Sequence, residues 1–120
     1  MSTTRNKAIV QKINDAFARG DVEGFLSYCS EDLVWNMVGH PQARGKAAIR
    51  QFMKSGPAEL PKFSVDTVVA EGDVVTVTGE MSMKEDGQDV PYSYCDVWRF
   101  NGNTIVELKA FVIKTAGVVV

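Results

Sequence analysis

The sequence predicts an α+β fold in which three helices pack on one face of a curved, mostly antiparallel sheet. Three observations lead to this fold class. Helical periodicity is confined to the first half of the chain, four β-rich segments fill the second half, and turn sequences separate those segments. The 120 residues suit one domain, residues 1–120, with a substantial core.

The first helix is expected near the N-terminus. Ser2–Thr4 offers N-caps, and Ile9, Ile13 and Phe17 then recur at every fourth position. This spacing places the three apolar side chains on one helical face. The helix is expected to end at Gly20.

The segments up to the middle of the chain follow in order. A second helix is expected over 22–29, "VEGFLSYC", and a strand over 33–38, "LVWNMV". The segment 39–45, "GHPQARG", is expected to form a loop. A third helix is expected over 46–55, "KAAIRQFMKS", with the following Gly-Pro pair ending it.

The second half predicts a β-meander. The breaks "EGD", "KEDGQD" and "NGN" are rich in turn-forming residues, and "NGN" suits a tight hairpin. Successive hairpins imply antiparallel neighbours. The expected strands cover 62–70, 74–83, 90–100 and 104–114.

Composition excludes several classes of protein. A net charge of −2 gives no electrostatic case for binding nucleic acid or an anionic membrane. The N-terminus shows no secretory signal and no apolar run could span a bilayer, so the cytoplasm is the expected location. Cys29 and Cys95 form no CxxC pair, and His40 is the single histidine. We therefore expect free thiols, no metal and no cofactor.

Two stretches carry a family resemblance over nearly the whole chain. They are "ARGDVEGFLSYCSEDLVWNMVGHPQARGKAAIRQF" and "YCDVWRFNGNTIVELKAF". The chain resembles the nuclear-transport-factor-2-like superfamily, and within it the branch of steroid delta-isomerases and SnoaL-like polyketide cyclases. The resemblance implies a cone-shaped α+β barrel around a deep apolar pocket, in which a few polar groups determine the function.

Asp96 is the first candidate acid. Strand alternation places it on one face with Tyr94, Trp98 and Phe100. A carboxyl group among aromatic side chains loses solvation, so its pKa should rise, and in its neutral form it can donate a hydrogen bond to a ligand oxygen. By resemblance, Asp96 falls where the isomerases place a protonated aspartate. The alternative is an aspartate that pairs with arginine or backbone amides to order the sheet.

Asn36 falls where the isomerases carry the aspartate that shuttles a proton. An amide cannot do this because its protonation does not change near neutral pH. Ile13 stands where they carry the tyrosine that donates to the oxyanion, so steroid delta-isomerase activity is not expected. Asn36 could instead bind a ligand or satisfy buried backbone groups.

Two other chemistries of the superfamily also lack their groups. Limonene epoxide hydrolases have a similar Asn-Met word, but their carboxylate–arginine–carboxylate set aligns with Thr78, Glu80 and Ala110, of which only Glu80 is acidic. The SnoaL-like cyclases place an acid/base aspartate near Ala110. The resemblance therefore implies a pocket without a complete known catalytic set.

The remaining candidates would line that pocket. Tyr94 is the best candidate to replace the phenol that the isomerases carry at the position of Ile13. It joins Asp96 and Asn36 as a catalytic candidate, although an aromatic cross-strand pair would also explain it. His40 could lie at the pocket mouth or in solvent. The ligand-binding candidates are Ile13, Phe17, Trp35, His40, Met53, Met81, Met83, Trp98, Ala110 and Val112.

The sequence leads to one principal function and two alternatives. The principal hypothesis is a protein that binds a small hydrophobic, steroid- or polyketide-like molecule, with cofactor-independent isomerisation, cyclisation or hydration as its chemistry. A non-catalytic binding module and a dimerising interaction domain are the alternatives. A homodimer is expected because the outer sheet face would carry apolar residues within a charged rim. These residues are Thr76, Thr78, Val97, Phe111 and Ile113 among Glu80, Arg99, Glu107 and Lys109.

Overall fold

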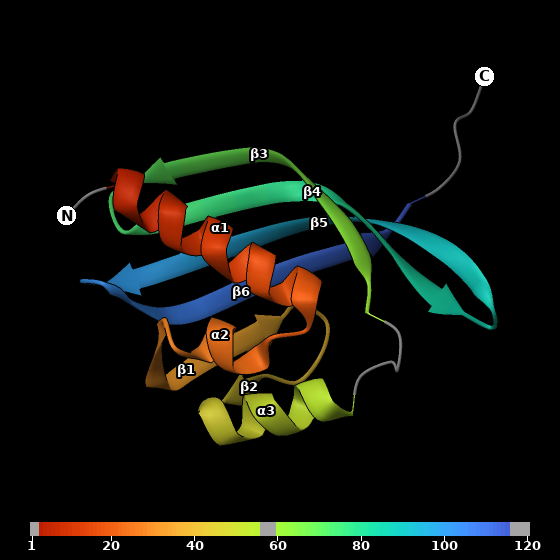
Figure 1. The fold of residues 1–120 in the computed structure, drawn as a ribbon, viewed down its shortest axis with the longest axis horizontal. Helices are drawn as coiled ribbons and strands as arrows, with labels where there is room; N and C mark the ends of the chain where they lie inside the picture. The colour runs from red at the N-terminus through yellow and green to blue at the C-terminus, as the bar shows by residue number, and fades with distance from the viewer. Residues whose placement is uncertain (1–2, 56–59, 116–120) are drawn as a thin grey trace.

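A computed structural model describes residues 3–55 and 60–115, in which three helices cover one face of a curved mixed sheet (Figure 1). The strand order across this six-stranded sheet is β2-β1-β6-β5-β4-β3. The predicted α+β fold class is confirmed. The elements are α1 (Thr3–Arg19), α2 (Val22–Leu26), β1 (Cys29–Met37), β2 (Ala43–Arg44), α3 (Lys46–Lys54), β3 (Lys62–Glu71), β4 (Val74–Glu85), β5 (Gln88–Asn101) and β6 (Thr104–Lys114).

The predicted meander is confirmed over its whole length. Strands β3, β4, β5 and β6 pair in sequence order, each antiparallel to the next. Strand β1 then adds beside β6 in parallel, and β2 pairs antiparallel with β1 at one edge. One parallel pair therefore makes the sheet mixed, and β3 forms the opposite edge.

Two expectations in the first half are wrong in detail. The second helix ends at Leu26, and Cys29 already belongs to β1, where it pairs with Ile105 of β6. Residues 43–44 form β2 inside the expected loop, because they pair with Val34 and Trp35 of β1. The partner strand of Cys29 is distant in sequence, so local propensity could not indicate that pairing. β2 pairs with a segment nearby in sequence, but it is only two residues long and shows no strand pattern. The predicted end of the third helix at Gly56–Pro57 lies outside the described residues.

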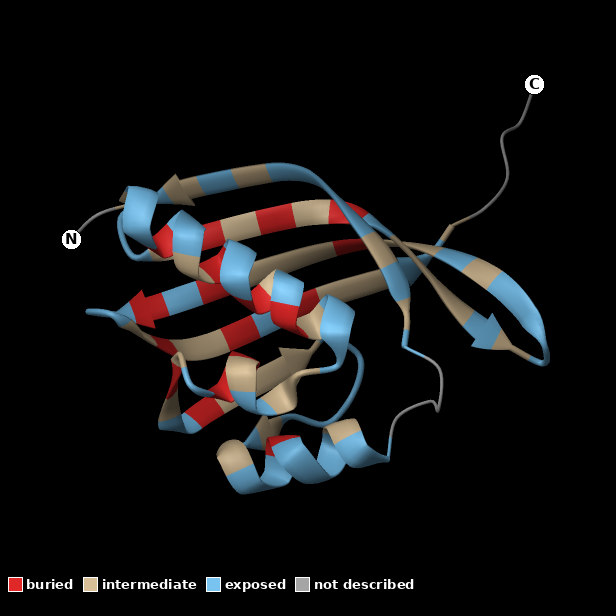
Figure 2. Ribbon diagram, in the orientation of Figure 1, coloured by how far each residue is buried: buried red, intermediate tan, exposed pale blue. Residues whose placement is uncertain are grey.

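Helix α1 lies across the sheet and shields its centre. Its buried residues are Asn6, Val10, Ile13 and Ala16, at the spacing of one helical face. Figure 2 shows the buried positions of β4, β5 and β6 beneath this helix. The core therefore lies between the helices and what we call the inner face of the sheet. The opposite side is the outer face.

The sheet has a bulge in its edge strand. Val65 pairs with Gly79 and Thr67 with Thr78, so Asp66 has no partner position on β4. A bulge of this kind bends a strand and increases its twist. An acidic residue at a bulge also discourages further strands from adding to this edge.

Among the described residues, no helix is both long enough and apolar enough to cross a membrane.

Candidate functional site

Asp96 occupies the centre of the inner face. Its cross-strand neighbours are Val77 on β4 and Ala110 on β6. Along β5, the same face holds Tyr94 and Trp98, two residues to either side. Val77, Ala110, Tyr94 and Trp98 are all buried. The carboxyl group is thus surrounded by apolar and aromatic side chains, as the alternation of β5 predicts.

The Asp96 carboxyl group has no hydrogen bond or ion pair with any other described residue. The side chain is half-buried. Burial raises the pKa of Asp96 to about 7, because its apolar surroundings solvate the charged form poorly. A substantial part of the protein therefore carries a neutral, proton-donating Asp96 at neutral pH. The alternative in which Asp96 pairs with arginine or backbone amides is wrong for this part of the chain.

The hydroxyl of Tyr94 forms a hydrogen bond within the sheet. Its hydroxyl donates to the carbonyl oxygen of Ser64 on β3, at 2.9 Å. Burial, and then the charges of Asp96 and Asp66, raise the pKa of Tyr94 to about 12. The phenol proton is therefore held by the sheet, and only the oxygen lone pairs of Tyr94 remain for a ligand.

Gly79 makes this bond possible. It lies opposite Tyr94 on β4, between β5 and β3. A Cβ atom at Gly79 would lie 2.0 Å from the Ser64 carbonyl oxygen and 2.6 Å from the Tyr94 hydroxyl. Only a residue without a side chain leaves room for the ring of Tyr94 to cross β4. This role of Gly79 could not be predicted from the sequence, because Ser64 and Tyr94 lie far from it along the chain.

Asn36 does not join Asp96, contrary to our expectation. It pairs with Lys109 on β6, and Lys109 pairs with Val97 on β5. Paired residues point to the same face and consecutive residues point to opposite faces, so Asn36 and Asp96 lie on different sides of the sheet. In β1 it is Met37 whose row reaches Asp96, through Ala110.

An aromatic cluster fills the inner face on the side of β1. The ring of Phe17 from α1 lies 4.9 Å from Phe25 and 6.3 Å from both Trp35 and Trp98. Phe25 from α2 lies 5.8 Å from Trp35 and 6.0 Å from Trp98. Each phenylalanine ring therefore packs against the other phenylalanine and against both indoles. The two indoles are linked through the phenylalanines.

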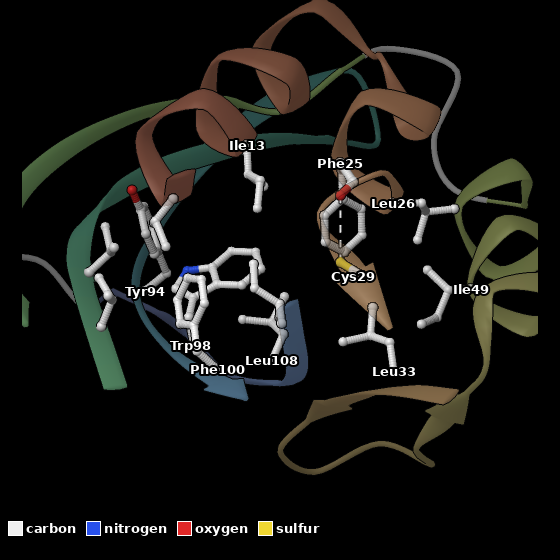
Figure 3. Packing of buried hydrophobic residues seen from close by; sticks show 14 residues of the cluster. Ile13, Phe25, Leu26, Cys29, Leu33, Ile49, Tyr94, Trp98, Phe100 and Leu108 are labelled. Atoms are coloured by element: carbon white, nitrogen blue, oxygen red, sulfur yellow. Dashed lines mark hydrogen bonds between the residues drawn. The ribbon is translucent and has the colours of Figure 1, made fainter. Parts of the chain in front are cut away.

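The other predicted ligand-binding residues divide into three groups. Ile13 and Ala110 are buried on the inner side, and Ile13 is fully inaccessible. Figure 3 shows Ile13 pointing from its helix toward the buried cluster. Met53, Met81 and Val112 are half-buried and pack against the core, whereas Met83 is half-buried farther out on β4. His40 is exposed in the turn after β1, and it does not join the group around Asp96.

Some buried residues on or against the inner face were also not predicted from the sequence. Val75 and Val77 are fully buried and cover the β4 side of the inner face. The alternation in "VVTVTG" signals this burial, and it could have identified both. Phe25 was missed because the helix that holds it is only five residues long and has no readable period.

Two cavities lie elsewhere on the surface. One, of about 470 Å³, runs between α1 and β3 and is bordered by Lys7, Gln11, Asp15, Phe63 and Val68 among others. The second, of about 390 Å³, lies beside α1 and α2. Asp96 borders neither of them, so the deep pocket around it that the resemblance implies stays a proposal.

The described residues contain no group of side chains that could bind a metal ion. Among residues 3–55 and 60–115, no three His, Cys, Asp or Glu side chains are grouped so that they could hold an ion. Cys29 is buried and Cys95 is half-buried, and both are free thiols. Burial raises the pKa of Cys29 to about 12, which makes it an unreactive thiol.

Comparison with known families gives one match, which covers most of the chain. The family described as "SnoaL-like domain" matches residues 10–108. No curated protein matches the chain.

Solved structures with the same fold extend this result. An NTF2-like protein of unknown function from Burkholderia pseudomallei K96243 superimposes with a TM-score of 0.84 at 22% identity, covering 92% of this chain and 90% of the other. A protein assigned as a polyketide cyclase from Xanthomonas campestris superimposes with a TM-score of 0.81 at 20% sequence identity, covering 91% of this chain and 90% of the other. A protein assigned as a ketosteroid isomerase from Kribbella flavida superimposes with a TM-score of 0.83 at 14% sequence identity, covering 97% of this chain and 83% of the other. At these identities the structures establish the fold alone.

Proposed function

Because this chain belongs to the SnoaL-like family, within the NTF2-like fold that isomerases, cyclases and epoxide hydrolases share, we propose that it binds a small hydrophobic molecule on the inner face of its sheet. The ligand is steroid- or polyketide-like, with an apolar body and at least one oxygen atom. The oxygen binds at Asp96, and the apolar body lies against the aromatic and aliphatic side chains around it.

One observation carries this proposal. A carboxyl group without a protein partner on an apolar face destabilises the fold, unless something else bonds to it. Asp96 is such a group, because Val77 and Ala110 flank it and its pKa is raised to about 7 by burial. A neutral carboxyl group in this setting is suited to donate its proton to a ligand oxygen.

The available chemistry is acid catalysis or binding alone. Asp96 can supply a proton to a carbonyl or hydroxyl oxygen and so assist isomerisation, cyclisation or hydration without a cofactor. Among the described residues, the other candidates give Asp96 no acid/base partner on this face: Asn36 lies on the outer face, Ile13 has no hydroxyl, and the Tyr94 hydroxyl donates to Ser64. Steroid delta-isomerisation, which needs a base that takes and returns a proton, is therefore not part of the proposal.

The test is recovery of a ligand with the purified protein. Organic extracts of the native protein should contain an oxygen-bearing apolar molecule that mass spectrometry identifies. Asp96→Ala should retain much less of it, whereas Asp66→Ala, which removes an exposed carboxylate at the bulge, should retain the native amount. Equal retention by all three proteins would remove Asp96 from the binding site.

We also propose that the outer face forms a homodimer. The strand register places Val97, Thr76 and Lys109 in one row of this face and Ile113, Ser93 and Glu80 in another. Ile113 is 66% exposed, which is high for an isoleucine in a sheet. The mixture of apolar centre and charged rim suits a second copy of the same chain, because an isologous contact pairs the patch with itself.

A further inference from the structure

Trp98 has a buried polar group that the packing around it does not explain. The residue is fully buried, and its indole nitrogen Nε1 has no hydrogen-bond partner. Phe17 and Phe25 cover its ring, and neither offers an acceptor. A buried N–H donor without an acceptor destabilises the folded state. Such a donor in a native structure calls for an explanation, and an acceptor supplied by a ligand is one.

The position of Trp98 relates this donor to Asp96. The two residues lie two positions apart on β5, so both side chains point to the inner face, with Cα atoms about 7 Å apart. In Figure 3 the indole nitrogen is on the side of the ring toward Tyr94, which is the direction of Asp96 along the strand. Asp96 itself has no partner among the described residues.

We propose that the indole N–H of Trp98 and the carboxyl group of Asp96 together bind one carbonyl oxygen of the ligand. This inference rests on the proposed function and names the class of ligand more narrowly. Both groups can act as donors, and a ketone oxygen has two lone pairs and no hydrogen of its own. An apolar molecule with a ketone group therefore satisfies both unpaired groups at once. A hydrocarbon of the same shape would leave both unsatisfied.

Other polar groups nearby do not compete for this role. The Tyr94 hydroxyl already donates to Ser64. Trp35 also has a buried, unpaired indole nitrogen, but it lies two strands away from Trp98, with Leu108 of β6 between them in the same row. Trp35 is therefore the matched control, since it shares the cluster and the unpaired N–H but not the position beside Asp96.

The first measurement uses the protein with one tryptophan left. The chain has two tryptophans, so Trp35→Phe leaves Trp98 as the single indole. The ketone 1-tetralone should move the indole N–H cross-peak of this variant downfield and slow its exchange with water. Tetralin, the hydrocarbon of the same shape, should cause neither change. A cross-peak that responds to both compounds alike would overturn the assignment of Trp98 as a donor to the carbonyl.

The second measurement compares affinities. Native protein should bind 1-tetralone more tightly than tetralin, and Trp98→Phe should reduce this preference about tenfold. Trp35→Phe keeps an aromatic ring in the cluster and removes the other unpaired indole N–H, so it should change the two affinities by the same factor and preserve their ratio. An unchanged preference in Trp98→Phe would overturn the inference and leave the proposed function intact. Binding of neither compound to the native protein would overturn both. If Trp98→Phe does not fold, the cross-peak measurement decides alone.

Discussion

Asn36 and Asp96 point away from each other, to opposite faces of one sheet. The register that pairs Asn36 with Lys109, and Lys109 with Val97, leaves no other arrangement. Family resemblance had placed both residues in one pocket. Since a shift of one residue along a strand changes the face of every side chain, a one-residue error in an alignment is enough to produce that expectation.

A carboxylate introduced at Asn36 should therefore leave Asp96 unaffected. Met37→Asp should raise the pKa of Asp96, because Met37 and Asp96 share a row with Ala110 between them. At about 10 Å, a second negative charge is expected to raise the pKa of Asp96 by about one unit or less. Asn36→Asp should not change it. NMR titration of the Asp96 carboxyl carbon measures both, and equal shifts in the two variants would contradict the register.

The same register bears on isomerase activity. Neither the native protein nor Asn36→Asp should move a double bond in a steroid-like enone, because the side chain at position 36 lies on the outer face, away from Asp96. Ultraviolet absorbance follows this migration directly. Robust activity in the native protein would show that a base exists on the inner face that the strand pairing does not reveal.

The raised pKa of Asp96 predicts a pH-dependent stability. The carboxyl group titrates at about 7 in the folded protein against 3.8 ordinarily, so between these pH values the folded state binds the proton and the unfolded state does not. Stability therefore falls as pH rises from about 4 to 7, by a few kcal/mol in order of magnitude. Asp96→Asn should match the native protein near pH 4 and exceed it at pH 8.

Urea denaturation at the two pH values measures this effect. Asp66→Asn is the control, since Asp66 is exposed at the bulge and should show no such crossover. The difference between native and variant also separates Asp96 from Glu23 and Glu85. Their pKa values are lowered by their bonds to Arg50 and Tyr92, so they act in the opposite direction in both proteins. If Asp96→Asn differed from the native protein by the same free energy of unfolding at pH 4 and at pH 8, the raised pKa of Asp96 would be contradicted.

Gly79→Ala should destabilise the protein by about 1–3 kcal/mol, the usual range for overpacking. The new Cβ would meet the Ser64 carbonyl and the Tyr94 hydroxyl. Thr78→Ala, on the outer face of the same strand, should cost less. Combining Gly79→Ala with Tyr94→Ala should cost less than the sum of the two single changes, because one obstacle is gone. Additive costs in thermal denaturation would show that the two residues do not compete for space.

Asn6→Leu should stabilise the protein. Asn6 is fully buried on α1, and neither its amide nitrogen nor its amide oxygen has a hydrogen-bond partner. Replacing an unsatisfied amide with an apolar side chain of similar size removes a desolvation cost of about 1–3 kcal/mol. Asn14→Leu, at a half-buried position of the same helix, is the control and should change little. A loss of stability in Asn6→Leu would indicate that a water molecule or ligand satisfies the amide.

The proposed dimer predicts a charge-sensitive outer face. Ile113→Lys should convert a homodimer to a monomer in sedimentation velocity at micromolar concentration, since it places a charge within the apolar patch. Val38→Lys introduces the same charge in the turn after β1, where Val38 is 45% exposed, and should preserve the dimer. A native protein that sediments as a monomer would contradict the proposal.

The order of the elements, apart from the two-residue β2, and the strand neighbours of Asp96 were predictable from the amino-acid sequence alone. Both are local properties: helical spacing in α1, turn residues between the strands, and the alternation in "PYSYCDVWRF" that groups Asp96 with Tyr94 and Trp98. The meander also follows from the sequence, because hairpin neighbours are adjacent in the chain.

Two features could be established only in three dimensions: which side chains of β1 face the core, and which group each polar side chain bonds. The pairing of β1 with β6 joins segments about 70 residues apart, and no local signal fixes the register of such a pair. The bond from Tyr94 across Gly79 to Ser64 and the absence of a partner for the Trp98 indole likewise depend on atoms from distant segments. Hydrogen-bond partners are selected by three-dimensional packing, whereas alternation and periodicity report only on the neighbours of a residue along the chain.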